Sequence, residues 1–428
     1  MNYRLSSFVE LIASTENNFD HSVGYHDIKP FGGLNNQFIL LHKYPLNNLG
    51  FLEKNINIDI CLWDYKNSKI YIIDETSAWS WEQGSRLQWI SDKEIIYNKI
   101  NEKKVISCIY NIETKQKKKL ESSLYSFSKK TNQILTINYS RIWSLWKSYG
   151  YFVPGEKNEL DKKPKDDGIY LTDTSNSNKK LILSINDAVE ICGLQNLKNT
   201  FFFLSFPTFS PSGDKFVSHL RFHLKSGALT TYFICTYLNK SKNIVLASEK
   251  VSHFEWINNE KIIVWSRNLP KYFQKLRLNN FLEKYIISYL KKFMNKFRSN
   301  FTLKIKSENY HLIDLDNPRE ITKINEKILT EDGHPQISED GKYLVTDTYA
   351  NQEGFQKLLI HDLNNNKTHY VGEFKIAEYL IKRGLKYDLH PRWNHKGDLI
   401  SIDSSHDGSR QSYVINVAKL IKNINRKN

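Results

Sequence analysis

One recurring pattern constrains the fold of this 428-residue chain more than any other feature. A proline or aromatic residue precedes a short apolar stretch, then a polar turn, then an alternating strand. The clearest copies are PTFSPSGDKFVSHL from Pro207, PQISEDGKYLVTD from Pro335 and PRWNHKGDLISID from Pro391, and weaker copies begin near residues 29, 87, 125 and 254. Each copy predicts two strands joined by a tight turn in which Gly or Asn adopts a positive φ.

A second strand pair follows most copies, with an Asp/Asn turn as in LLIHDLNNNKTHYV. Four strands in each of seven units predict an all-β fold, a seven-bladed β-propeller that occupies residues 1–428 as a single domain. The chain is rich in Trp, Tyr and Phe and contains only two Met, a bias that favours strands. Only two helical stretches are expected, one near the N-terminus and one within residues 267–306.

The repeat also predicts where polar side chains gather. In a propeller, the loop leading into each inner strand and the loop between the second and third strands open at the same end of the ring. Four of the seven inner strands have a histidine at this position: His26, His253, His334 and His390. A single histidine there often bonds only a backbone carbonyl, so the prediction of a site depends on the convergence of all four.

Loops between second and third strands are expected to frame this site. They contribute Tyr349, His406 and Arg410, and an aromatic-rich insertion at residues 139–167. The insertion carries Arg141, Tyr149 and Tyr151, and aromatic faces beside cationic groups suit anionic sugar rings or bases. His395 belongs to a turn at the opposite end and is not a candidate.

Two kinds of chemistry fit these residues. His390, His334 and Asp388 are candidate ligands for a divalent metal such as Mn, Zn or Ca. Without a metal, histidines beside Tyr and Arg offer acid–base chemistry near neutral pH. The sequence leaves both alternatives open.

The net charge of +15 is concentrated in one segment. Residues 267–306 contain eleven Lys and Arg and one acid, and an apolar stripe runs through a predicted helix from Leu282 to Phe297. Three interpretations are a helix packed on the propeller, contact with an anionic membrane surface, and contact with an acidic protein partner. Specific nucleic-acid binding is not expected because no nucleic-acid motif accompanies the charge.

The chain begins without a basic stretch followed by an apolar block, and no stretch reaches the ~20 apolar residues that span a bilayer. Four widely spaced cysteines show neither metal spacing nor a disulfide framework. We expect a cytoplasmic, monomeric protein with reduced thiols.

Several stretches resemble known proteins. The repeated turn is similar to those of TolB-like propellers. More narrowly, DLHPRWNHKGDLISIDSSHDGSRQSYVINV resembles the last blade of the polysaccharide lyases that include oligogalacturonate lyase and the ulvan lyases. SWEQGSRLQW, SYGYFVP and DGHPQISEDGKYLVTDTY resemble the same group. Where oligogalacturonate lyase has a manganese-binding Gln-x-x-His-x-His run, this chain has Leu385, Asp388 and His390.

The resemblance implies binding and β-elimination of an acidic, uronic-acid-containing polysaccharide or oligosaccharide. In that chemistry Arg410 or Arg392 holds the sugar carboxylate, a histidine of the site is the base, and Tyr349 or Tyr151 is the acid. Further expected substrate contacts are Arg86, Arg141, Tyr149, His406 and Gln411. The alternative is a non-catalytic scaffold for surface-glycan assembly, which contacts a membrane or an acidic partner through residues 267–306.

Overall fold

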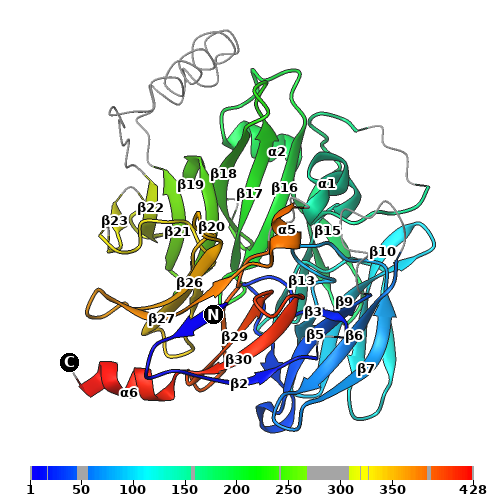
Figure 1. Ribbon diagram of the computed structural model, residues 1–428. Helices are drawn as coiled ribbons and strands as arrows, with labels where there is room; N and C mark the ends of the chain where they lie inside the picture. The colour runs from blue at the N-terminus through cyan, green and yellow to red at the C-terminus, as the bar shows by residue number, and fades with distance from the viewer. Residues whose placement is uncertain are drawn as a thin grey trace.

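Seven antiparallel sheets follow one another around a ring (Figure 1). This computed structural model describes residues 2–16, 18–45, 56–155, 160–240, 242–267, 308–318, 320–325, 327–382 and 387–426. The predicted seven-bladed propeller with four-stranded antiparallel blades is confirmed. Each of the seven copies of the repeat falls on the first strands of a different blade.

The first four blades follow the chain without exchange of strands. Blade 1 contains β3 (Asp20–Ser22), β4 (Phe31–Gly32), β5 (Phe38–Tyr44), β6 (Ile58–Asp64) and β7 (Lys69–Thr76). Blade 2 contains β8 (Gln88–Trp89), β9 (Glu94–Asn101), β10 (Lys104–Asn111) and β11 (Lys117–Leu120). Blade 3 contains β12 (Ser126–Ser128), β13 (Gln133–Thr136), β14 (Gly168–Asp173) and β15 (Lys179–Ser184). Blade 4 contains β16 (Phe202–Phe209), β17 (Lys215–His223), β18 (Leu229–Tyr237) and β19 (Asn243–Glu249).

The last two of the remaining three blades include strands from the N-terminal segment. Blade 5 contains β20 (Val251–Trp256), β21 (Lys261–Arg267), β22 (Glu308–Asp314) and β23 (Ile321–Lys323). Blade 6 contains β24 (Gln336–Ile337), β25 (Tyr343–Asp347), β26 (Phe355–Asp362) and β27 (Lys367–Lys375), with β1 (Tyr3–Leu5) outside β27. Blade 7 contains β28 (Arg392–Trp393), β29 (Leu399–Ser404) and β30 (Gln411–Asn416), with β2 (Glu10–Ser14) outside β30.

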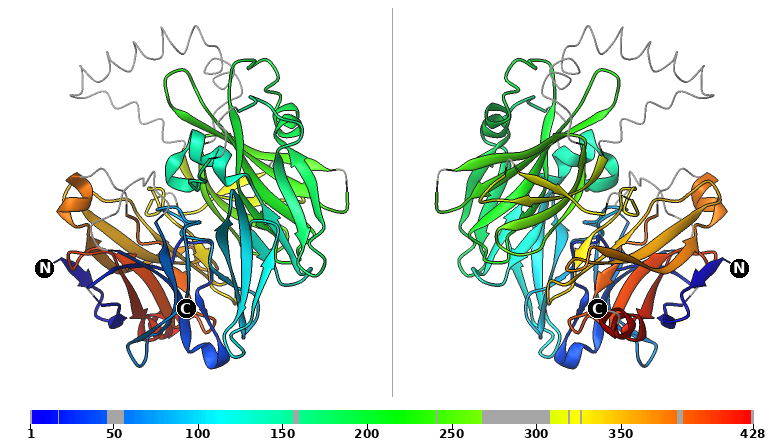
Figure 2. Two further views of the ribbon diagram at one scale, coloured as in Figure 1. Left: turned by 90° about the vertical axis from the view of Figure 1, so that its right-hand side faces the viewer. Right: turned by 90° about the vertical axis from the view of Figure 1, so that its left-hand side faces the viewer.

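The N-terminal strands close the ring. Figure 2 shows them, in dark blue, against the orange and red sheets of blades 6 and 7. Strand β2 runs antiparallel to β30, with Glu10 opposite Asn416 and Ser14 opposite Tyr413. Its residues alternate between exposed and half-buried, which is the period of a strand, so the expected N-terminal helix is wrong.

The predicted turn chemistry is present in the three clearest copies of the repeat. Gly213, Gly341 and Gly397 have φ of 74°, 74° and 69°, and in the one-residue-longer turn of blade 3 Asn132 has φ 54°. These left-handed conformations are cheapest for Gly and Asn, which explains why the repeat requires them. The turns therefore set the register of the first two strands of these blades.

Apolar residues pack between the faces of neighbouring blades. Leu40 and Ile60 of blade 1, for example, belong to one cluster with Trp89 and Tyr97 of blade 2. All four cysteines are free; three are buried and Cys192 is half-buried. The cysteines contribute to packing rather than to cross-links, and their redox state stays a prediction.

Four α-helices lie among the described residues: α1 (Tyr139–Leu145), α2 (Ile185–Ile191), α5 (Glu378–Lys382) and α6 (Ala418–Arg426). Two short 3-10 turns, η1 (Leu34–Asn36) and η2 (Lys147–Tyr149), accompany them. None of these helices has the length and apolar character that crossing a bilayer demands. The basic segment connects β21 to β22, and its predicted helix lies outside the described residues.

Candidate functional site

Four histidines meet at one end of the ring, where blades 1, 5, 6 and 7 come together. The ring centroids of His253 and His334 are 4.1 Å apart, and those of His334 and His390 are 4.3 Å apart. His26 lies 5.3 Å from His334 and 5.6 Å from His253. All four side chains are buried. The structure thus brings together the four residues that the repeat placed at one end; their roles stay predictions.

Three of these rings are held through Nδ1. The Nδ1 of His334 lies 2.9 Å from Oδ1 of Asp347, and that of His253 lies 3.0 Å from Oδ1 of Asp332. The Nδ1 of His26 lies 2.9 Å from the carbonyl oxygen of Pro335. A partner on Nδ1 fixes the tautomer and leaves Nε2 as the acceptor or metal ligand.

Asp347 also shapes the backbone beside the histidines. It accepts hydrogen bonds from the backbone N–H of His334 at 2.7 Å and of His390 at 3.0 Å. His390 has φ 43°, a conformation that costs a residue other than Gly roughly 1–3 kcal/mol. Burial raises the pKa of the Asp347 carboxyl to about 7. One carboxylate therefore positions two of the four rings.

His390 has two ring nitrogens that are buried without a hydrogen-bond partner among the described residues. Leaving one such group unsatisfied costs about 1–3 kcal/mol. Burial, followed by the neighbouring rings and Arg392, holds the pKa of His390 well below its ordinary value, so the ring is neutral at pH 7. A neutral imidazole without a partner is suited to bind a metal ion.

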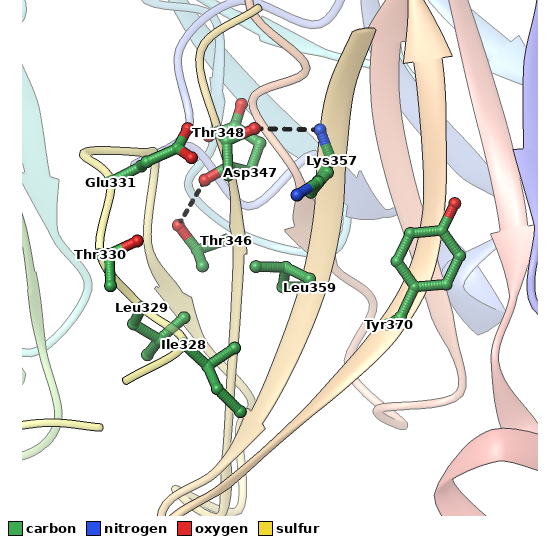
Figure 3. A pocket seen from close by; sticks show the side chains of 10 residues that line it. All are labelled: Ile328, Leu329, Thr330, Glu331, Thr346, Asp347, Thr348, Lys357, Leu359 and Tyr370. Carbon is green, nitrogen blue, oxygen red and sulfur yellow. Dashed lines mark hydrogen bonds between the residues drawn. The ribbon is translucent and has the colours of Figure 1, made fainter. Parts of the chain in front are cut away.

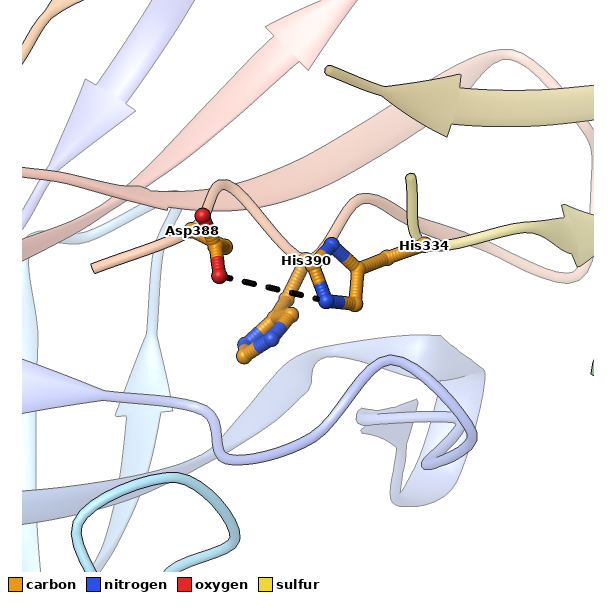
Figure 4. A group of neighbouring side chains, drawn as sticks. All are labelled: His334, Asp388 and His390. Atoms are coloured by element: carbon orange, nitrogen blue, oxygen red, sulfur yellow. Dashed lines mark ion pairs between the residues drawn. The ribbon is translucent and has the colours of Figure 1, made fainter. Parts of the chain in front are cut away.

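Asp388 completes a group that fits a metal. Ligand atoms of His334, Asp388 and His390 all lie within 4.8 Å of one another (Figure 4). Gln356 donates from Nε2 to Oδ1 of Asp388 at 3.0 Å, while Oδ2 lies 4.0 Å from Nε2 of His334. Two imidazoles and a carboxylate suit Mn or Zn. They do not suit Ca, which prefers six to eight oxygen ligands.

Arg221 is the main functional candidate that the sequence analysis missed. This β17 residue is buried, and its guanidinium carbon lies 4.7 Å from the ring centres of both Trp146 and Phe206. Its Nε donates to Oγ1 of Thr231 at 3.2 Å, but Nη1 is buried without a partner among the described residues. Arg221 also lines a small cavity with His253. A buried cation without a carboxylate is rare and indicates an anionic ligand.

Aromatic side chains form the wall between Arg221 and the histidines. The ring of Tyr25 lies 4.6 Å from His26, 5.0 Å from His390 and 5.4 Å from Phe206. Tyr349, from the loop after β25, lies 6.0 Å from His334. Burial, followed by nearby carboxylates, raises the pKa of Tyr349 well above its ordinary value, so its hydroxyl keeps its proton. The site therefore contains a protonated phenol beside neutral imidazoles.

The insertion at residues 139–167 reaches the site through Tyr149. Its ring stacks on Trp146 at 3.7 Å and lies 6.1 Å from Tyr25. Helix α1 begins this segment, and Asn138 caps the helix by accepting from the backbone N–H of Arg141. A Cβ on Gly150 would lie 2.0 Å from the backbone nitrogen of Trp143, so only glycine lets the chain turn back here.

Other predicted substrate contacts have their polar groups bound within the scaffold. Arg86 forms a two-point ion pair with Asp27 at 2.8 and 2.7 Å. Arg141 donates to the carbonyl oxygens of Phe202 and Asp161. The Tyr151 hydroxyl lies 3.1 Å from the side-chain nitrogen of Asn98. These contacts do not require a ligand, and the expected substrate contacts of these residues stay predictions.

The remaining candidates lie toward blade 7 and the N-terminal strands. Arg392 binds Asp403 and backbone carbonyls, and Arg410 lies 4.4 Å from the ring centres of both Trp81 and Tyr387. His406 contacts Tyr3 and Phe374, and Gln411 accepts from Thr15 and donates to the carbonyl of Phe19. These contacts join blade 7 to its neighbours. The expected clamp and contact roles stay predictions, and Leu385 lies outside the described residues.

No known family model matches the chain, and no curated protein matches its sequence. Solved structures do match. One is an oligogalacturonate lyase in complex with manganese, with a TM-score of 0.59, 12% identity and coverage of 97% of this chain and 96% of that one. Another is the oligogalacturonate lyase of Vibrio parahaemolyticus, with a TM-score of 0.57, 11% identity and the same coverage.

The chain has the fold of oligogalacturonate lyase. A third match, TolB from Acinetobacter baumannii, has a TM-score of 0.39 and 13% identity, and covers 84% of this chain and 78% of that one. At these identities the likeness concerns the fold alone.

Proposed function

We propose that this chain is a lyase that cleaves an acidic, uronic-acid-containing oligosaccharide or polysaccharide by β-elimination. The observation that carries the proposal is the combination, around one small cavity, of Arg221 and His253. Nη1 of Arg221 is buried without a partner among the described residues, and Nδ1 of His253 is bound by Asp332. Arg221 offers a cation to a carboxylate, and His253 offers a base in a fixed tautomer. The fold shared with oligogalacturonate lyases supports the same chemistry.

In this proposal, Arg221 binds the sugar carboxylate. The buried guanidinium has one nitrogen free for such a contact, and Trp146 and Phe206 flank the group. Charge neutralisation of the carboxylate makes the adjacent C5 proton more acidic. Arg392 and Arg410 each have one buried nitrogen without a partner in the described part of the chain as well. Arg221 takes the clamp role in this proposal because it lines the cavity with His253, whereas Arg392 pairs with Asp403 and Arg410 donates to the carbonyl oxygen of Trp81.

His334, His390 and Asp388 are the residues that would hold a metal. When bound there, a divalent ion such as Mn or Zn acts as a Lewis acid that draws charge from the carboxylate. Asp347 fixes the ring of His334, and Gln356 fixes the carboxylate of Asp388. Such outer partners keep ligands in position before the ion arrives.

Proton transfer falls to His253 and Tyr349. Nε2 of His253 removes the C5 proton, and Asp332 stabilises the imidazolium that forms. The C5–H and C4–O bonds break, a C4=C5 double bond forms, and Tyr349 protonates the departing oxygen. The pKa of Tyr349, raised by burial, ensures that this proton is present at neutral pH.

Ultraviolet absorbance of the new C4=C5 double bond tests the proposal. The protein is mixed with oligogalacturonate and with other uronate polymers, with and without Mn²⁺. We expect absorbance to rise with at least one polymer, and His253→Gln to abolish the rise. His395→Ala is the matched control. The imidazole of His395 contacts Glu339 in a turn at the opposite end of the propeller. No rise with any polymer would refute the proposal.

The contact of residues 267–306 with an anionic membrane or an acidic partner stays a prediction. Among these residues only Arg267 is described, and it pairs with Glu308. The expected compartment and monomeric state stay predictions as well. Deleting residues 271–300 should abolish binding to anionic vesicles if the segment makes this contact.

A further inference from the structure

A second cavity lies behind the histidine site, between the segment that follows β23 and one face of blade 6 (Figure 3). Its volume is about 220 Å³. We call it the flank cavity and define it by Ile328, Glu331, Thr346, Thr348, Lys357 and Tyr370. Since a water occupies roughly 30 Å³ of liquid, it has room for about seven waters or one sugar ring.

The floor of the flank cavity follows from strand pairing in blade 6. Thr346 of β25 is opposite Leu359 of β26, which is opposite Tyr370 of β27. Thr346, Asp347 and Thr348 all line the cavity, and the carboxylate of Asp347 also binds Nδ1 of His334. The flank cavity and the histidine site therefore share the end of β25 as a wall.

The segment at residues 328–334 forms the second shared wall. Ile328 and Glu331 line the flank cavity, whereas Asp332 binds His253 and His334 belongs to the histidine site. Gly333 lies between the two because a Cβ there would be 1.9 Å from the carbonyl oxygen of Asp347. This close approach fixes the segment against β25.

The lining specifies the chemistry of a ligand. Glu331 and Lys357 lie on either side of the two threonines (Figure 3), and neither side chain has an ion-pair partner among the described residues. The amine of Lys357 suits a carboxylate, and Glu331 suits hydroxyl groups. Tyr370 is 40% exposed and Ile328 is 53% exposed, so apolar faces remain open to a ring. Together they select a small hydroxylated carboxylate with an apolar ring face.

We propose that the flank cavity binds one free hexuronic acid. Its carboxylate contacts Lys357, its hydroxyls contact Glu331 and the threonines, and its ring lies against Tyr370. The choice of a uronic acid rests on the proposed function, for which a short acidic sugar is the product. A ligand here contacts the segment that carries Asp332 and His334. It therefore binds beside Asp332, the partner of the proposed base His253, and beside His334, a proposed metal ligand.

Calorimetric titration with galacturonate and with glucuronate tests this proposal. We expect one of them to bind the wild-type protein, and Lys357→Met to weaken binding about tenfold to hundredfold. Lys342→Met is the matched control, because this exposed lysine of the same blade pairs with Asp340 outside the cavity. Lys342→Met and His390→Ala should leave the affinity unchanged.

Three results would overturn the flank cavity as a site: no binding of either sugar, binding that is insensitive to Lys357→Met, or binding that is lost in His390→Ala. The last would assign the sugar to the histidine site. Failure of the proposed lyase function is separate, because it is measured by ultraviolet absorbance with polymers. If the protein shows no lyase activity but binds galacturonate, and Lys357→Met weakens that binding, the proposed function fails and the flank cavity stands as a binding site.

Discussion

Two aspartates beside the histidines have separable tasks. Asp347 holds the ring of His334 and the backbone of His390, whereas Asp332 holds only His253. Asp347→Asn is expected to weaken Mn²⁺ binding about 10–100-fold, which is typical for the loss of an outer partner. Asp332→Asn should leave Mn²⁺ binding intact and lower kcat.

Equilibrium metal titration and steady-state kinetics on both variants check this pair. Because the two substitutions are isosteric, each is the control for the other. Equal effects of both variants on Mn²⁺ affinity would contradict the assignment of Asp332 to the base alone.

Arg221 offers a test that separates activity from stability. A buried guanidinium without a carboxylate partner is costly, and methionine of similar length removes that cost. Arg221→Met is therefore expected to lower kcat/KM about 10²-fold or more while Tm stays the same or rises. Activity assays and thermal unfolding measure the two effects, and Arg4→Met, at an exposed ion pair with Glu373, is the control. A large fall in Tm would mean that Arg221 is structural.

At the residue scale, the sequence predicted the histidines better than their partners. His334 and His390 each precede the proline of a repeat copy, so the fold itself predicts their position. Arg221 occurs within an ordinary strand, SHLRFHL, and only a three-dimensional view reveals that its Nη1 is buried without a partner in the described part of the chain. An arginine between two buried apolar residues, Leu220 and Phe222, was the available signal.

At the scale of single elements, strand β2 and the residue that follows it hold blade 7 together. Thr15 donates from Oγ1 to Oε1 of Gln411 and accepts from the backbone N–H of Ser412 at 3.0 Å, all in the buried interior. Thr15→Val keeps the shape but removes both bonds. We expect the free energy of unfolding to fall by about 1–3 kcal/mol.

Urea denaturation measures this change. Thr114→Val, in the exposed turn between β10 and β11, is the control and should change stability by less than about 0.5 kcal/mol. An effect of Thr15→Val as small as that of the control would show that β2 contributes little to closure.

Hairpins with a strong turn signal were predictable from the sequence, but the closure of the propeller by β2 was not. The turns at Gly213, Gly341 and Gly397 can be predicted from a few neighbouring residues, and each turn predicts its hairpin. The pairing of β2 with β30 joins residues about four hundred positions apart, and nothing local to either strand encodes it. The same reason explains the mistaken N-terminal helix, since a short amphipathic stretch has no fixed period until its partner is known.

At the scale of the whole molecule, buried neutral histidines make stability depend on pH. Burial lowers the pKa of His42 to about 3 and that of His21 to about 4. Below pH 6.5 the unfolded chain binds protons that the folded protein does not. The stability from these residues is thus complete above pH 6.5 and is lost as the pH falls toward 4, by up to about 1.4 kcal/mol per unit for each histidine.

Thermal unfolding between pH 7.5 and about 4 checks this dependence. His42 joins blades 1 and 2 because its Nε2 accepts a hydrogen bond from the backbone N–H of Ser85 at 3.1 Å. His42→Gln is expected to lower Tm at pH 7.5 but to flatten the fall of Tm toward acid. A wild-type Tm that rises on acidification would contradict the sign of the effect.

Blade 7 combines an N-terminal strand with three C-terminal strands, and this has a consequence for synthesis of the protein. Strand β2 is synthesised early, but β30 follows about four hundred residues later, a delay of about 20–80 s at roughly 5–20 residues per second. Until then, β2 is an open edge that other chains can pair with. His390, a few residues before β28, also emerges late. On the ribosome, the four-histidine site therefore cannot assemble until the ring does, so a partly made chain is exposed to aggregation and lacks this site.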